Sequence, residues 1–158
     1  MPQRHPVTPA TTLLDQRGAE YTKHQYDYTK KGATVAAQLM GVDPHAVIKT
    51  LVMMDNQGNP MIVLMHAEKE VSLKELARQT GAKNVSTAPA RDAERLTGYS
   101  VGGISPFATR RPMPVFVQKT ILELSYLYIN GGRRGFILGM TPGTLMEILN
   151  AAPIDVAR

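Results

Sequence analysis

Alternating apolar runs and turn residues divide the chain into short elements. Two apolar runs, VIKTLVMM (47–54) and MIVLMHA (61–67), are joined by DNQGNP, whose Asn, Gly and Pro are typical of a turn. We therefore expect them to pair as a hairpin in the buried centre of a sheet. Apolar, β-branched or aromatic runs predict further strands at 21–28, 84–87, 114–119, 126–130 and 136–140.

Helix starts are marked by capping residues and helix ends by glycine. Thr8 before Pro9 predicts a helix through about Arg17, and Thr141 before Pro142 predicts a closing helix. The sequence SLKE at 72–75 matches a capping box for a helix that ends at Gly81. Two more helices are expected at 33–41 and 90–96. In the helices at 33–41, after Ser72 and after Thr141, the positions expected to face inward are Val35, Leu39, Met40, Leu73, Leu76, Ala77, Leu145, Ile148 and Leu149.

Strands and helices are interleaved, but the hairpin and the short connections after residue 114 argue against a purely parallel sheet. We predict an α/β (α+β) fold with a mixed, mostly antiparallel sheet curled into a barrel-like core with surrounding helices. With 158 residues, 43% of them hydrophobic, the chain is long enough for one core. Residues 1–8 are expected to be a flexible lead-in and residues 9–158 a single domain.

Composition narrows the environment and the partners. Cysteine is absent, which excludes disulfides, thiolate zinc sites and a protein thiol nucleophile, and agrees with a cytoplasmic location. We expect no membrane association, because the chain shows no signal-peptide pattern and no apolar run long enough for a membrane span. The formal net charge of +5 favours a polyanionic partner without identifying it.

Common catalytic motifs are missing. The sequence contains no G-x-S-x-G, Walker or H-E-x-x-H motif, and its histidines at 5, 24, 45 and 66 are not clustered. A triad hydrolase, a P-loop enzyme and a zinc protease are therefore not indicated.

Lys49 is the most unusual residue in the pattern. It lies inside an apolar strand and alternates onto the same face as Val47, Leu51 and Met53. One interpretation is a charge on an exposed edge or a snorkelling side chain. The other is a cation that lines a pocket and binds a phosphate, a carbonyl oxygen or a carboxylate.

Two double glycines form a second candidate site. Gly102-Gly103 precedes Arg110-Arg111, and Gly131-Gly132 precedes Arg133-Arg134. Each pair can be a simple turn, but together they can form opposite lips of an anion or oxyanion site built from backbone N–H groups. Ser105 has Pro106 behind it and no histidine nearby, which favours a turn over a nucleophile. Among the aromatic residues, Tyr26, Tyr126 and Tyr128 are expected in the core or at a pocket rim.

Four motifs in this order resemble the YbaK/EbsC family: V-I-K-T-L at 47–51, L-K-E-L-A-x-x-x-G-A-K at 73–83, T-G-Y-x-V-G-G-I-S-P at 97–106 and N-G-G-R-R-G at 130–135. The resemblance covers about residues 9–152. The family comprises freestanding relatives of the editing domain inserted in bacterial prolyl-tRNA synthetase. It implies hydrolysis of mischarged aminoacyl-tRNA, with cysteine removed from tRNA(Pro) in the YbaK type.

The resemblance also implies a site. Lys49 matches the family's pocket lysine, and the catalytic set is completed by Gly102, Gly103 and Gly131. The expected substrate contacts are Tyr26, Thr50, Ile104, Ser105, Asn130, Gly132 and Arg133. The implied partners are mischarged tRNA, above all tRNA(Pro), and prolyl-tRNA synthetase, and no metal or other cofactor is implied.

Asn130 and Ile137 depart from the YbaK type, which has a serine and an acidic residue at these places. The departure leaves open which amino acid is removed, with alanine and serine as alternatives to cysteine. The nucleophile is either the substrate's own thiolate or a water molecule. A non-catalytic nucleic-acid-binding regulator is the rival from another class, although the sequence shows no basic helix, helix-turn-helix or aromatic stripe.

Overall fold

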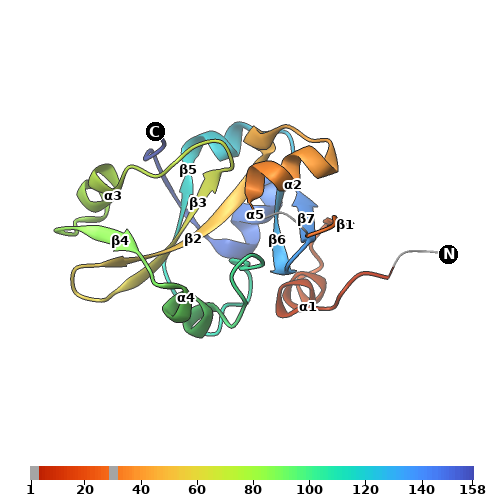
Figure 1. Ribbon diagram of the computed structural model, residues 1–158, viewed down its shortest axis with the longest axis horizontal. Coiled ribbons are helices and arrows are strands. Elements are labelled where there is room, and N and C mark those ends of the chain that lie inside the picture. The colour runs from red at the N-terminus through yellow and green to blue at the C-terminus, as the bar shows by residue number, and fades with distance from the viewer. Residues whose placement is uncertain (1–3, 29–31) are drawn as a thin grey trace.

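A mixed sheet with helices around it forms the fold in the computed structural model, which describes residues 4–28 and 32–158 (Figure 1). The strands are β1 (Thr22–Gln25), β2 (Val47–Asp55), β3 (Pro60–His66), β4 (Val85–Thr87), β5 (Val115–Gln118), β6 (Leu127–Arg133), β7 (Phe136–Met140) and β8 (Ala152–Ile154). The helices are α1 (Pro9–Gln16), α2 (Ala33–Met40), α3 (Leu73–Thr80), α4 (Ala90–Thr97) and α5 (Pro142–Leu149), with short 3₁₀ turns η1 (Pro44–Ala46) and η2 (Lys119–Glu123).

The strand order is β1-β7-β6-β2-β3-β5-β8, and β4 pairs with β2 beyond this path. The pairs β1·β7, β2·β3, β2·β4 and β6·β7 are antiparallel, whereas β2·β6, β3·β5 and β5·β8 are parallel. The predicted α/β class and mixed, mostly antiparallel sheet are confirmed. The sheet stays open, because β1 and β8 lie at its two ends in the described part of the chain.

The central hairpin is buried on both faces. Along β3, Ile62 and Leu64 join the larger core cluster, and Met61, Val63 and Met65 join a second cluster with α3. Successive side chains of a strand point to opposite faces, so a strand covered on both sides must be apolar throughout. This double burial explains the uninterrupted apolar run that marked residues 61–67.

Helix ends follow the capping residues. Thr8, Ser72 and Thr141 each accept a hydrogen bond from the backbone N–H three residues on, and Gly41 and Gly81 end their helices in the left-handed conformation. The five predicted helices are confirmed. Leu39 and Leu73 were expected to face inward, but these residues are 53% and 42% exposed. The buried residues are Ala36 and Ala37 in α2, and Leu76 and Ala77 in α3.

Three strand predictions need correction. The first strand is shorter than 21–28, because only residues 22–25 pair with β7. Gly131 to Arg133 were expected to interrupt the sheet, but they continue β6 through an irregularity between Asn130 and Arg133. Strand β8 was not expected, since its sequence API is short and carries a proline, which is tolerated at the sheet edge where this strand pairs with β5.

The segment before α1 touches the domain. The ring of His5 stacks on Phe136 at 6.1 Å, and the Thr8 hydroxyl donates to Gly131 O at 2.6 Å. Residues 1–3 of the expected lead-in lie outside the described residues. Within the described ranges, no helix has the length and hydropathy needed to cross a membrane.

Candidate active site

The candidate site is a cavity of about 180 Å³ beside β2 and β6. These parallel strands pair at only two positions, Val47 with Tyr128 and Ile48 with Ile129. Where the pairing ends, Thr50 of β2 and Asn130 of β6 line the cavity. The two strands separate beyond Ile48 and Ile129, so the sheet topology itself leaves room for this site between them.

Apolar side chains form much of the wall. Ala33 and Ala36 come from α2, Val47 and Ile48 from β2, and Ile137 from β7. The two alanines let α2 approach β2 closely, because a methyl group is the smallest apolar side chain. A water-poor wall of this kind strengthens any polar contact made inside the cavity.

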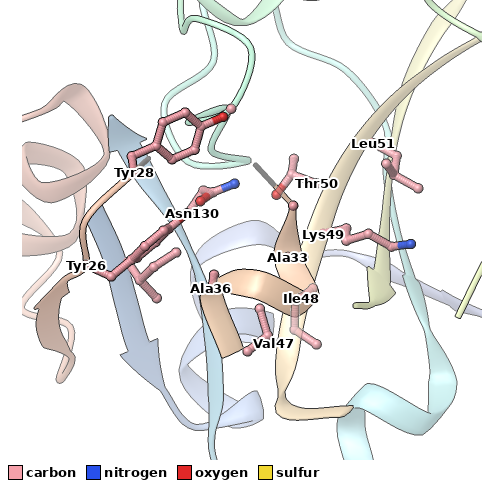
Figure 2. A pocket seen from close by; sticks show the side chains of 13 residues that line it. Tyr26, Tyr28, Ala33, Ala36, Val47, Ile48, Lys49, Thr50, Leu51 and Asn130 are labelled. Carbon is pink, nitrogen blue, oxygen red and sulfur yellow. The ribbon is translucent and has the colours of Figure 1, made fainter. Parts of the chain in front are cut away.

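Four polar side chains also line the cavity: Tyr26, Tyr28, Thr50 and Asn130. Figure 2 shows the Thr50 hydroxyl and the Asn130 amide facing one another, with the tyrosines on the Asn130 side. Thr50 Oγ1 is buried and has no hydrogen-bond partner among the described residues. A buried polar atom without a partner costs about 1–3 kcal/mol, which a ligand that bonds to it removes.

Burial raises the pKa of Tyr26, and neighbouring Tyr28 adds to the increase. The Tyr26 hydroxyl therefore keeps its proton at neutral pH and can donate a hydrogen bond.

Lys49 lines the cavity but turns its charge away from it. Figure 2 shows the Lys49 ammonium pointing to the side of β2 where Leu51 lies, opposite to Tyr26 and Asn130. Its Nζ donates to Lys69 O at 2.6 Å. Burial lowers the pKa of Lys49, while Glu70 and Glu68 act in the opposite direction.

Of the four predicted loop glycines, Gly102 lines the cavity. Its φ is +98°, and an added Cβ would collide with the Tyr28 hydroxyl, so only glycine fits. Gly103 N–H donates to Ser100 O at 3.0 Å, and a Cβ on Gly103 would lie 2.6 Å from the backbone carbon of Arg133. The two glycine clusters thus pack directly against each other.

The remaining predicted residues lie outside the cavity wall. Gly131 faces the core, since a Cβ there would lie 2.7 Å from the Phe136 ring. Gly132 lies against Tyr99 and Thr8, and Arg133 is exposed.

Ile104 and Ser105 are also buried away from the cavity. Ile104 belongs to the larger core cluster. Ser105 Oγ accepts from Phe107 N–H at 3.2 Å, which is the turn geometry favoured from the sequence.

Sequence reasoning missed Tyr28, Ala33 and Ala36. The alternation of Tyr26 and Tyr28 was a usable signal, because side chains two residues apart in an extended segment share a face. The small residues of α2 carried no such signal, since alanine is common in any helix.

Among the described residues, one group of candidate metal ligands occurs: His45, His66 and Glu68, whose ligand atoms lie within 4.8 Å of one another. The two imidazole rings stack in parallel, with centroids 3.6 Å apart and planes at 7°. His66 Nδ1 donates to His45 O at 2.6 Å, and its Nε2 contacts Thr120 Oγ1 at 2.7 Å. Both nitrogens of His66 are engaged, and lone pairs of parallel stacked rings do not converge on one ion, so the group does not fit a metal site.

Comparisons with known proteins identify the family of the chain. Residues 29–148 match the family described as the aminoacyl-tRNA editing domain. EbsC of Enterococcus faecalis, named as a candidate Cys-tRNA(Pro)/Cys-tRNA(Cys) deacylase, is 26% identical over 145 residues, which are 90% of this chain and 88% of that protein. The proline–tRNA ligase of Thermodesulfovibrio yellowstonii is 25% identical over 123 residues, 77% of this chain but 21% of the ligase.

Solved structures show the same fold. The crystal structure of hypothetical protein APE2540 has a TM-score of 0.88 and 27% identity, covering 96% of this chain and all (100%) of the other. A candidate trans-editing enzyme for prolyl-tRNA synthetase has a TM-score of 0.83 and 21% identity over 97% of this chain and 99% of its own. Since the family match spans most of the chain and includes the cavity-lining residues from Gly32 to Ile137, this chain belongs to the aminoacyl-tRNA editing domain family.

Proposed function

We propose that the chain hydrolyses the ester of mischarged aminoacyl-tRNA in trans, with Cys-tRNA(Pro) as its expected substrate. Family membership and the likeness to EbsC support this activity. The observation that carries the proposal is the small cavity where the pairing of β2 with β6 ends, in which an unpartnered hydroxyl is buried beside apolar walls. Because charged tRNA is used in translation, we place the activity in the cytoplasm, with prolyl-tRNA synthetase as a candidate partner.

Cavity size restricts the acyl group. A volume of about 180 Å³ equals that of about six water molecules in the liquid. A small aminoacyl group fits this space, whereas the terminal adenosine must lie outside it. Restricting the acyl side chain by size lets one pocket reject bulkier esters.

Thr50 and Asn130 hold the ester in this proposal. The Thr50 hydroxyl donates to one oxygen of the substrate and thereby gains the partner that it lacks in the free protein. Asn130 offers both a donor and an acceptor, and Tyr26 adds a donor at the rim. Gly102 places bare backbone in the cavity wall, Gly103 sets the contact between the two loops, and Gly131 packs against Phe136 in the core.

Lys49 supplies the positive charge. Lys49 starts on the face of β2 opposite to Thr50, but β6 pairs with β2 only as far as Ile48. In this proposal its flexible side chain leaves Lys69 O, turns around this unpaired edge of β2 and brings the ammonium to the substrate, where it stabilises the negative charge that develops on the carbonyl oxygen. Lys69 is an exposed residue, so in this proposal water replaces the ammonium at its carbonyl and the exchange costs little.

The attacking group comes from the substrate or from water. With cysteine, the thiolate sulfur attacks its own carbonyl carbon, the ester C–O bond breaks, and the released ribose oxygen takes a proton; water then opens the cyclic thioester to free cysteine. With alanine or serine, a water molecule attacks the carbonyl directly. Both routes need positioning and charge stabilisation rather than a nucleophilic side chain.

A panel of mischarged tRNAs tests the proposal. Cysteinyl-, alanyl- and seryl-tRNA are incubated with the protein, and loss of each ester is followed. We expect cysteinyl-tRNA(Pro) to lose its amino acid fastest. Faster loss of alanine or serine would assign the substrate to that ester, and Asn130 and Ile137 would be the first residues to examine by substitution.

Lys49→Ala is expected to lower kcat/KM by about 100-fold or more, as when an oxyanion-stabilising donor is removed. Lys74→Ala, at an exposed position on α3, is the matched control and should retain the parental rate. Circular dichroism and the thermal midpoint verify that both variants are folded. Deacylation by Lys49→Ala at the parental rate would refute the assignment of Lys49.

A further inference from the structure

A band of positive charge runs beside the cavity. We define the basic band as Arg4, Lys23, Arg133 and Arg134, which come from the segment before α1, from β1 and from the end of the β6–β7 hairpin. Arg4, Lys23 and the Arg133-Arg134 pair lie in three separate segments of the chain. The fold brings these segments together.

Three adjoining hollows make the band continuous. A hollow of about 370 Å³ is lined by Arg4, His5, Gln25, Arg133 and Arg134, among others. It shares His5 and Gln25 with a hollow of about 490 Å³ that contains Lys23. It shares Arg133 and Arg134 with a third hollow of about 510 Å³. Shared walls mean that a single extended ligand can pass from one hollow to the next.

No acidic residue lines any of the three hollows in the described part of the chain. The ion pairs among the described residues engage other cations: His45, Arg78, Arg95, Lys119 and Arg158. The band therefore keeps its charge for a partner, and its side chains are exposed to solvent.

Arg134 connects the band to the cavity. Its Nε donates to Val101 O at 2.9 Å, its guanidinium lies 5.8 Å from the centre of the Tyr28 ring, and its Cγ would lie 3.3 Å from a Cβ on Gly102. Tyr28 and Gly102 both line the cavity. The band thus begins at the rim of the site and leads away from it along the N-terminal segment.

We propose that the basic band binds the sugar-phosphate backbone of the single-stranded 3′ end of tRNA, and so sets the path by which the RNA leaves the cavity. This inference rests on the proposed function for the ester but is tested without it. Exposed cations in a groove that tracks a strand are the usual basis of single-strand binding. His5, whose Nδ1 is buried without a described partner, lines two of the hollows.

The test uses a triple variant, Arg4→Gln, Lys23→Gln and Arg133→Gln. Arg134 stays, because its removal would also release the Val101 loop. The control is Lys74→Gln, Arg78→Gln and Lys83→Gln, which removes equal charge from exposed positions on and after α3. In Figure 1, α3 lies at the opposite end of the molecule from β1.

Binding of uncharged tRNA and of a short single-stranded RNA ending in CCA is measured over a range of salt concentrations. We expect the band variant to bind roughly tenfold more weakly, since exposed ion pairs contribute modestly one by one. The slope of log affinity against log salt should fall by about 0.7 for each phosphate contact removed. The control should match the parent in affinity and slope.

Equal losses in the band variant and the control would overturn the proposal, because the effect would then be one of net charge alone. Parental binding by the band variant would overturn it as well. Neither outcome depends on hydrolysis, so failure of the band and failure of the deacylase activity are separate results. If the esters are hydrolysed, the KM of the band variant should rise more for aminoacyl-tRNA than for aminoacyl-adenosine, which has no phosphodiester.

Discussion

Thr50 and Lys49 are neighbours in β2 with opposite orientations. Thr50 places a hydroxyl without a partner inside the cavity, and Lys49 places its ammonium on the Lys69 carbonyl outside it. The alternation of a strand forces this difference, because adjacent side chains point to opposite faces. In the free protein the Thr50 hydroxyl is therefore available to a ligand, whereas the Lys49 ammonium is bonded to the Lys69 carbonyl.

Replacing Thr50 by valine should separate stability from activity. Valine has nearly the same shape, so Thr50→Val removes the unpartnered oxygen without opening a hole, and the free energy of unfolding should rise by about 1 kcal/mol. Deacylation should slow about tenfold or more, since the ester loses a hydrogen-bond donor. Urea unfolding and single-turnover hydrolysis measure the two effects. Thr50→Ser, which retains the hydroxyl, is the control; loss of stability in Thr50→Val would mean that the hydroxyl has a partner in solution.

The sequence predicted which residues line the cavity better than it predicted the contacts of their side chains. Thr50, Asn130, Tyr26 and Gly102 were expected at the substrate, and all four line the cavity. Strand alternation places Lys49 on the face opposite to Thr50, but the partner of its ammonium was not predictable, because only the folded backbone brings the Lys69 carbonyl within 2.6 Å.

Among the elements, the contact between the two glycine loops is the most sensitive to substitution. Gly103 lies so close to Arg133 that no side chain fits between their backbones. This contact fixes the position of Gly102 in the cavity wall relative to Asn130 on β6.

Gly103→Ala is expected to destabilise the fold by about 2–3 kcal/mol, because the new methyl group collides with backbone that cannot move aside locally. Gly58→Ala is the control: Gly58 has a positive φ, of +79°, whereas Gly103 does not, and nothing lies within 4 Å of the Cβ added to Gly58. That change should cost only about 1 kcal/mol of backbone strain. Urea midpoints of the two variants decide the comparison, and an equal loss in both would show that the loops do not make the contact described.

Elements with local signals were predictable, and elements that depend on distant partners were not. The caps at Thr8, Ser72 and Thr141 and the DNQGNP turn marked their helices and the central hairpin within a few residues. Strand β8 and the continuation of β6 through Gly131 exist only because β5 and β7 pair with them. Leu39 shows the same limit, since α2 packs through its alanines.

For the whole molecule, the stacked pair of His45 and His66 links stability to pH. His66 is fully buried at the end of β3, and the charged or titratable groups around it are His45, Glu68 and Lys69. Burial lowers its pKa, the hydrogen bond to the His45 carbonyl raises it, and the net direction is downward. Burial likewise lowers the pKa of His24.

A buried histidine with a lowered pKa binds fewer protons in the folded than in the unfolded chain. Its stabilising contribution is therefore complete above the unfolded pKa of about 6.5 and is lost as the pH falls below it. We expect the free energy of unfolding to decrease from pH 7.5 to pH 5, by at most about 1.4 kcal/mol per pH unit for each such histidine. Urea unfolding of the parent and of His66→Gln across this range gives the two slopes. The slope of the variant should be smaller, and equal slopes would show that another group is responsible.

The two-residue pairing between β2 and β6 has an evolutionary consequence. The opening beside these strands is produced by main-chain geometry, so its existence does not depend on the side chains that decorate it. Under the proposed function, we expect exchanges at 130 and 137, which line the cavity, to change which acyl group is accepted while the scaffold stays as it is. A family built on this plan can diversify in substrate preference by very few mutational steps.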